Sequence, residues 1–169
     1  MNKPPPHSSP SSLTLREMVD DDLDAFFAQQ LDPDANWMAA FTNRDPSDRE
    51  AFIAHWDRIR LNPTVILRTI VAGEEVAGYV SSYEDEGQPE ITYWLGRAYW
   101  GRGIATRALA AFLETASTKR PIRARVAQDN LGSLRVLQKC GFIITGEDAG
   151  FAKARGRETS EYILMLHPM

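Results

Sequence analysis

Two glycines, Gly101 and Gly103, lie one residue apart just before a segment with helical spacing. Glycine has no Cβ, so the chain can turn tightly there and approach a ligand closely. The backbone amides at the start of a helix bind phosphate oxygens, and Arg102 and Arg107 add positive charge. This combination is compatible with a phosphate-binding loop, although a two-glycine loop before a helix is more often only a turn.

The rest of the chain predicts the elements that must position this loop. A strand, the glycine loop, a helix and a second strand follow one another over residues 90–126, which implies a parallel or crossover pairing of the two strands. Residues 31–44 fit either a loop or a short helix, and Ser47 and Glu50 have the spacing of a capping box. The apolar patterns predict strands over residues 13–18, 65–71, 76–83, 90–95, 122–126, 142–145 and 161–166, and helices over residues 22–30, 47–59, 105–116 and 130–140.

Length and composition indicate one globular domain. The chain has 169 residues, of which 43% are hydrophobic and 25% charged, as in an ordinary globular protein. We therefore expect a single α/β domain over residues 13–169. Residues 1–12 are rich in proline and serine and have almost nothing to bury, which predicts a disordered tail.

Charge and cysteine content argue against several other classes of protein. The formal net charge of -4 is unlike the basic surface of a nucleic-acid binder. One cysteine, Cys140, allows neither an internal disulfide nor a thiolate metal cluster, so no metal site is predicted. No apolar run approaches the roughly 20 residues that span a bilayer, and residues 1–12 lack the apolar core of a signal peptide. A cytoplasmic protein that does not bind membranes is the default expectation.

Two segments resemble motifs of the GNAT acetyltransferases. The run Trp100-Gly101-Arg102-Gly103-Ile104-Ala105 resembles their coenzyme A pyrophosphate loop, with Trp100 where the family has Gln or Arg. The phrase Tyr-Trp-Gly-Arg-Gly-Ile-Ala is similar to the RimJ/RimL-like branch, which includes acetyltransferases of ribosomal-protein N-termini. Residues 130–142 resemble the family's N-x-x-S…K-x-G-F helix. The resemblance extends over residues 13–166 and is strongest over residues 90–142.

The resemblance implies a fold and an activity. The fold would be a central mixed α/β sheet flanked by helices, with acetyl-CoA in a gap between central strands. The activity would be transfer of an acetyl group from acetyl-CoA to a primary amine by direct attack on the thioester. The acceptor stays open between a protein N-terminus and a small amine. A non-catalytic acetyl-CoA sensor is the alternative, and a homodimer is compatible with a chain of this size.

The resemblance also implies where acetyl-CoA binds. The backbone of Trp94 and Leu95 would pair with the pantetheine arm, and Asn130 would bond the pantetheine or position the thioester. The amides that would hold the pyrophosphate belong to Gly101, Arg102, Gly103, Ile104, Ala105 and Thr106.

Two residues are candidates for catalysis. Ser133 falls where it could protonate the leaving thiolate or only cap its helix. Glu90 is either a general base, acting directly or through water, or a solvated carboxylate at the start of a strand. Leu137 occupies the position of the tyrosine that often serves as general acid in the family, and Arg125 occupies another position used for a catalytic glutamate. Those two groups are therefore missing here.

Overall fold

One mixed sheet organises residues 12–169, the part of the chain that the computed structural model describes. The predicted disorder of residues 1–12 lies outside the described residues, apart from Ser12. Within this range seven strands follow the order β1-β2-β3-β4-β5-β7-β6, and β4 and β5 form the parallel pair. The strands are β1 (Leu13–Arg16), β2 (Ile66–Ala72), β3 (Glu75–Asp85), β4 (Gln88–Leu95), β5 (Ile122–Ala127), β6 (Ile143–Ala152) and β7 (Arg157–Leu166).

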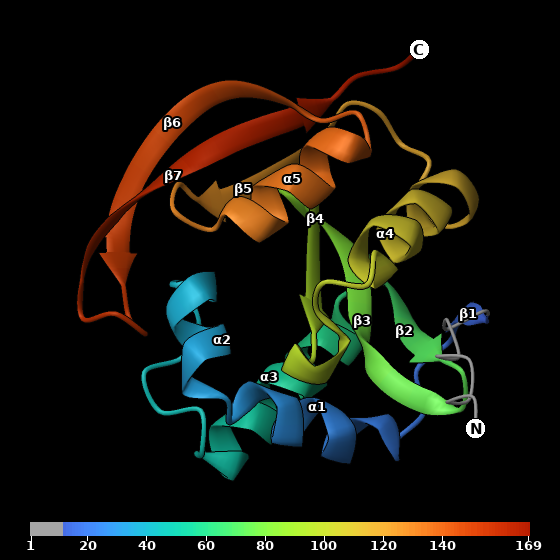
Figure 1. Ribbon diagram of the computed structural model, residues 1–169, viewed down its shortest axis with the longest axis vertical. Coiled ribbons are helices and arrows are strands. Elements are labelled where there is room, and N and C mark those ends of the chain that lie inside the picture. Colours follow the sequence, from blue (N-terminus) through green and yellow to red (C-terminus); the bar gives the residue numbers. More distant parts are fainter. Residues whose placement is uncertain (1–11) are drawn as a thin grey trace, which may run out of the picture.

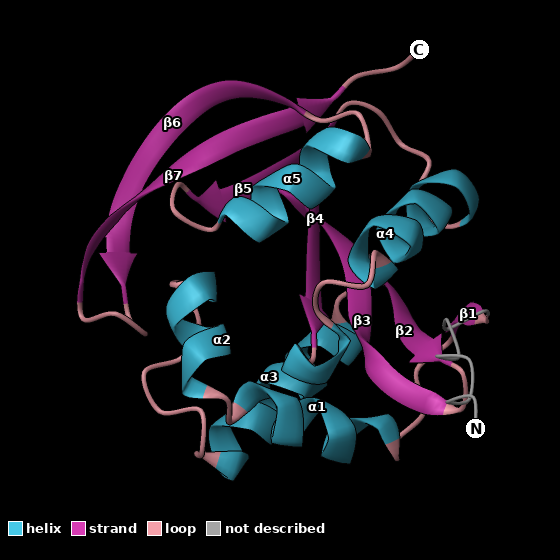
Figure 2. Cartoon of the chain, in the orientation of Figure 1, coloured by secondary structure: helices cyan, strands magenta, loops and turns pink. Residues whose placement is uncertain are grey.

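Helices cover the sheet on both faces (Figures 1 and 2). Helices α4 and α5 share the larger apolar cluster with the sheet, whereas α1 and α3 form a separate cluster with β2 and β3. The mixed α/β fold flanked by helices, as predicted, is confirmed. The helices are α1 (Asp22–Gln30), α2 (Pro33–Ala39), α3 (Arg49–Leu61), α4 (Ile104–Thr115) and α5 (Leu131–Lys139), with a short 3-10 helix η1 (Arg97–Tyr99).

Strand alternation separates the two apolar clusters. Tyr79 and Val80 are neighbours in β3, so their side chains point to opposite faces of the sheet. Val80 is fully buried in the cluster that contains Phe112 of α4. The Tyr79 ring packs against Phe26 of α1 and Trp56 of α3, with centroid distances of 5.1 and 5.0 Å. Adjacent residues of one strand therefore pack against the helices on the two opposite faces of the sheet.

The β4–β5 pair is short. The two strands share one register pair, Glu90 with Arg123, although β4 continues to Leu95 and β5 to Ala127. Within residues 12–169, the edge of β4 that faces β5 therefore has no strand partner beyond Glu90, and its backbone groups can bond to something else. The parallel pairing predicted over residues 90–126 is confirmed, and the sheet opens next to it.

Several boundaries differ from the sequence predictions. Residues 31–44 contain the short helix α2, one of the two possibilities left open. The capping box predicted at Ser47 and Glu50 is wrong, because α3 begins at Arg49 and its N-cap is Asp48. The Asp48 carboxylate accepts the Ala51 amide at 3.0 Å, and an aspartate caps a helix as well as a serine does.

A buried carboxylate fixes the start of α1. Asp22 is 3% exposed and accepts two hydrogen bonds from the Arg16 guanidinium, at 2.7 and 2.8 Å. The Val19 amide and the Thr69 hydroxyl also donate to it, at 3.0 and 2.8 Å. Burial alone would raise the pKa of the Asp22 carboxyl, but these hydrogen bonds together outweigh burial and hold it below its ordinary value. The carboxylate thus ties β1, α1 and β2 together.

We expect Asp22→Asn to lower the free energy of unfolding by about 2 kcal/mol at pH 7, because charged hydrogen bonds are lost in a buried place. Since the pKa of Asp22 is lowered, the wild-type advantage is complete above the unfolded value near ~4 and shrinks as the pH falls below it. Urea denaturation from pH 3 to 7 measures both effects. Asp24→Asn, in an exposed pair with Arg49, is the control and should change stability by less than about 0.5 kcal/mol.

Candidate active site

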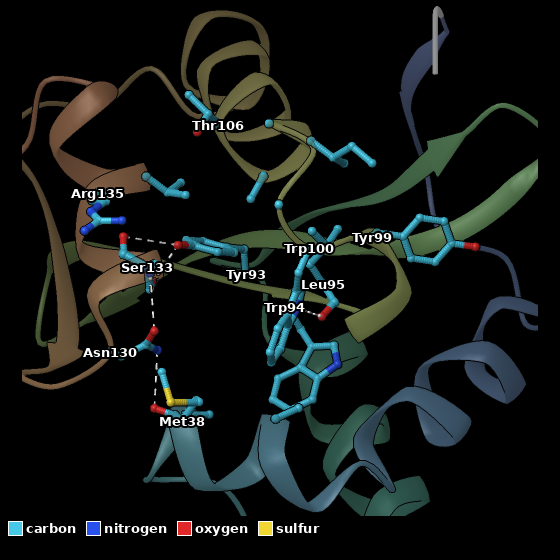
Figure 3. Close-up of a pocket in the computed structure, with 18 of the residues that line it drawn as sticks. Met38, Tyr93, Trp94, Leu95, Tyr99, Trp100, Thr106, Asn130, Ser133 and Arg135 are labelled. Atoms are coloured by element: carbon cyan, nitrogen blue, oxygen red, sulfur yellow. Dashed lines mark hydrogen bonds between the residues drawn. The ribbon is translucent and has the colours of Figure 1, made fainter. Parts of the chain in front are cut away.

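A cavity of about 450 Å³ lies at the end of β4, between the start of α4 and the helices α2 and α5 (Figure 3). The open edge of β4 forms part of its wall. The cavity gathers most of the residues that the sequence singled out. Those that line it are Trp94, Leu95, Gly101, Gly103, Ile104, Ala105, Thr106, Asn130 and Ser133.

One end of this cavity suits an anion. Gly101 and Gly103 have φ angles of +75° and +74°, which side chains with a Cβ rarely adopt. The first amides of a helix have no intrahelical partner. The N-cap of α4 is Gly103, which has no side chain to accept a hydrogen bond from them. Arg135 and Lys139 also line the cavity, and no Asp or Glu of the described residues does. A diphosphate fits these donors.

Arg102 does not line the cavity. Its guanidinium lies over the Tyr99 ring, 6.0 Å from the centroid, while its neighbours in the loop face the site. Trp100, the departure from the family pattern, is bound to the strand that leads into the loop. Its indole N–H donates to the Leu95 carbonyl at 2.8 Å (Figure 3). This bond fixes the glycine loop against the end of β4.

Two hydroxyl groups meet on the α5 side of the cavity. The Tyr93 and Ser133 hydroxyl oxygens are 2.6 Å apart (Figure 3). Burial raises the pKa of Tyr93 to about 12, so the phenol keeps its proton at physiological pH. The N-cap of α5 is Asn130, whose side-chain oxygen accepts the Ser133 amide at 3.3 Å. Ser133 is therefore not the cap, and that alternative reading of Ser133 is wrong.

Asn130 also connects two walls of the cavity. Its side-chain amide donates to the Met38 carbonyl of α2 at 3.3 Å, while its oxygen caps α5. Both hydrogen bonds are visible in Figure 3. The residue thus holds α2 and α5 at a fixed separation across the cavity that it lines.

Glu90 lies away from this cavity. It is 5% exposed, so the interpretation as a solvated carboxylate is wrong. One carboxylate oxygen accepts hydrogen bonds from Arg123 and Arg125, at 3.1 and 3.2 Å. The other accepts the Tyr83 hydroxyl at 2.9 Å. The structure therefore places Glu90 in an ion-pair cluster at the point where β4 and β5 separate.

The cavity residues that were not predicted from the sequence include Tyr93, Arg135 and Lys139. Tyr93 looked like an ordinary apolar position of a strand, and only the position of α5 brings its hydroxyl to Ser133. Arg135 and Lys139 are four residues apart on α5, so both lie on the helix face that lines the cavity. That spacing, together with Asn130 at the cap, is the signal that could have placed both at the cavity.

The fold and this site define a mixed α/β protein with a cavity that suits an anion where β4 and β5 separate. The sequence profile of the acetyltransferase (GNAT) domain matches residues 12–143. The chain therefore belongs to the GNAT family, which confirms the predictions of an N-acetyltransferase that uses acetyl-CoA. Within residues 12–169, no helix has both the length and the apolar character needed to cross a membrane.

Relatives and solved structures agree with this family. The N-acetyltransferase p20 of Bacillus licheniformis, itself described as uncharacterized, is 27% identical over 163 residues, which cover 91% of this chain and 92% of that protein. RimJ of Mycobacterium smegmatis, in complex with CoA-disulfide, gives a TM-score of 0.78 at 21% identity and covers 94% of this chain and 83% of its own. Spermidine N-acetyltransferase of Vibrio cholerae, in complex with CoA and spermine, gives 0.76 at 16% identity over 93% and 96%. At these identities the two structures show the shared fold.

Proposed function

We propose that the protein transfers the acetyl group of acetyl-CoA to a primary amine by direct attack of the amine on the thioester. The observation that carries this proposal is one cavity in which an uncapped helix N-terminus and an unpaired strand edge lie beside the Tyr93–Ser133 hydroxyl pair. The first two features suit the coenzyme. The third suits departure of its thiol.

The residues of the cavity fit the successive parts of acetyl-CoA. When bound, the coenzyme supplies the reactive thioester and an anionic diphosphate. The first-turn amides of α4, with Arg135 and Lys139, hold the diphosphate. The open edge of β4 near Trp94 offers backbone groups to the amides of the pantetheine arm, as a neighbouring strand would.

The chemistry requires a neutral amine and a proton for the departing thiolate. The Tyr93 phenol keeps its proton and can donate it to the Ser133 oxygen. When the serine proton passes to the leaving sulfur, the phenol proton replaces it, and the proton lost by the attacking amine passes through water to restore the phenol. An α-amine with a pKa near ~8 is neutral more often at pH 7 than a lysine amine near ~10, and it needs less help from a base. No covalent enzyme intermediate is required.

The acceptor is a small amine or a protein N-terminus. Both kinds occur among the structural neighbours, which include the spermidine N-acetyltransferase and RimL, a ribosomal L7/L12 alpha-N-protein acetyltransferase. Isothermal titration with acetyl-CoA, followed by a thiol-release assay over small amines and N-terminal peptides, tests the proposal. Turnover on one acceptor supports it. Binding without turnover on any amine favours the sensor alternative, and no binding by the folded protein contradicts the proposal.

Glu90 is proposed to hold the opening of the sheet rather than to act as the base. Both its oxygens are occupied, and it does not line the cavity. Its partners Arg123 and Arg125 belong to β5, and Arg125 also pairs with Glu161 of β7 at 3.0 Å. The carboxylate therefore compensates two positive charges across the only register pair of the described β4 and β5.

We expect Glu90→Gln to lower the melting temperature by about 5 °C, because two partly buried arginines lose a counter-charge. The kcat should change by less than about threefold, whereas loss of a general base would lower it by about 100-fold or more. Differential scanning fluorimetry and the thiol-release assay measure the two effects. The exposed Glu114 of α4 gives the matched control, Glu114→Gln. A 100-fold loss of kcat at unchanged melting temperature would restore the role of Glu90 as base.

A further inference from the structure

A second cavity, of about 220 Å³, lies among α1, α3 and the residues that follow α2. Its walls are largely aromatic and include Phe26, Phe52, Trp56 and Tyr79. These residues belong to the smaller apolar cluster, so the cavity lies on the face of the sheet opposite to α4 and α5. The volume is below the usual range for sites that hold drug-sized ligands and suits a group of about one amino acid.

The two cavities meet at Trp94. This residue lines both, and α2 contributes Asn36 to the second cavity and Met38 to the first. Trp94 follows Tyr93 in β4, so its side chain points away from the Tyr93–Ser133 pair, toward the other face. A molecule in the second cavity therefore has one end next to β4, the strand along which the pantetheine arm is proposed to lie.

The lining of the second cavity carries no formal charge near neutral pH. In the described part of the chain, no Asp, Glu, Lys or Arg lines it. Its titratable groups are His55 and Tyr79. Partial burial and the positive charge of Arg58 lower the pKa of His55, and burial raises the pKa of Tyr79 to about 12, so both are neutral at pH 7. A second ammonium group in this cavity would have no carboxylate to pair with, which disfavours polyamines.

Two buried polar atoms of this lining have no hydrogen-bond partner among residues 12–169. They are the Trp94 indole nitrogen and the Thr42 hydroxyl oxygen. Two amide side chains of the lining are occupied, since that of Gln30 donates to Pro46 and that of Asn36 donates to Gln30 and Asp32. An indole N–H only donates, so it requires an acceptor atom such as a carbonyl oxygen. Buried polar groups are normally satisfied, and a bound molecule would satisfy these two.

We propose that the second cavity binds the body of the acceptor amine and selects a small, uncharged aromatic group that carries a carbonyl next to the amine. This inference rests on the proposed function and gives its acceptor a chemical class. The aromatic walls hold the ring, and the Trp94 indole N–H with the Thr42 hydroxyl binds the carbonyl. Phenylalanine amide has these features, and so does the N-terminal residue of a peptide that begins with Phe.

The test compares kcat/KM for phenylalanine amide, phenethylamine and spermidine, in the wild type and in Trp94→Phe. The two aromatic amines differ in basicity, so the readout is the change in their ratio between the two proteins. We expect the amide-to-phenethylamine ratio to fall about fivefold in Trp94→Phe, because one hydrogen bond is lost. Trp37→Phe is the matched control, since Trp37 lies against Arg155 and Arg157, lines neither cavity and should leave the ratio unchanged.

A second variant keeps the test decisive if Trp94→Phe also disturbs the first cavity. Thr42→Val removes the second unpartnered polar group, the Thr42 hydroxyl, and of the two cavities Thr42 lines only the second. It should lower the same ratio while acetyl-CoA affinity stays constant. An unchanged ratio in both variants, or a higher kcat/KM for spermidine than for either aromatic amine, overturns the inference. A peptide that begins with Phe, used as a fourth substrate, separates a protein acceptor from a small one.

Failure of the proposed function gives a different pattern. In that case acetyl-CoA binds but no amine of the panel is acetylated. Binding of phenylalanine amide to the coenzyme-loaded protein is then followed by tryptophan fluorescence, because Trp56 and Trp94 both line the second cavity. Binding that weakens in Thr42→Val supports the cavity assignment without turnover, and absence of binding overturns it.

Discussion

Gly78→Ala is expected to lose about 3 kcal/mol of folding stability and most of the affinity for acetyl-CoA. A Cβ at this position would lie 2.0 Å from the Trp94 carbonyl oxygen and 3.0 Å from the Leu95 Cα. Both are backbone atoms of β4, so no side-chain rotation can relieve the clash. The strands β3 and β4 must separate at the end of β4, where the first cavity begins.

Urea denaturation and titration with acetyl-CoA measure the two losses. Gly146→Ala is the control, because its Cβ would meet only the Ile163 side chain at 3.9 and 4.0 Å, an ordinary contact. That control should stay within about 0.5 kcal/mol of the wild type. Wild-type stability in Gly78→Ala would mean that β3 and β4 can move apart freely, and the site would not depend on their close approach.

The second large effect concerns the hydroxyl pair. Ser133→Ala is expected to lower kcat about 100-fold with little change in the affinity for acetyl-CoA, because it removes the proton donor to the thiolate. Tyr93→Phe should lower kcat about tenfold, since the serine remains but is no longer oriented by the phenol at 2.6 Å. Steady-state kinetics with a saturating amine, together with isothermal titration, separates kcat from binding.

The pH dependence gives an independent check on Tyr93. Because burial raises its pKa to about 12, the phenol stays protonated up to pH 10, and the wild type should show no loss of kcat from Tyr93 ionisation in that range. Ser160→Ala, an exposed serine of β7, is the control for the serine change. Equal kcat in Ser133→Ala and the wild type would remove Ser133 from the mechanism.

The local parts of the site could be predicted from the sequence. Gly101 and Gly103, followed by a helix with regular apolar spacing, are compatible with a loop that approaches a ligand, and the structure places both at the first cavity. The parallel crossover over residues 90–126 followed from element order. These features depend on neighbours in the chain, where propensities and spacing carry the information.

The non-local parts could not be predicted. The Tyr93 hydroxyl meets Ser133 across 40 positions of sequence, and the Glu90 cluster joins β3, β4 and β5. β6 was predicted to end at residue 145, but it continues to Ala152 through Gly146 and Gly150. Glycine weakens a strand, and only pairing with β7 along its full length keeps that segment extended. Such outcomes are decided by packing between distant elements.

The short pairing between β4 and β5 has a consequence for the cooperativity of unfolding. One register pair joins two halves of the sheet, the first made of β1 to β4 and the second made of β5, β7 and β6. A coenzyme arm along the free edge of β4 would act as an eighth, non-peptide strand that completes the sheet. Its binding free energy would then be added to the coupling between the two halves of the sheet. Amide hydrogen exchange in both halves should therefore slow together when the coenzyme is present.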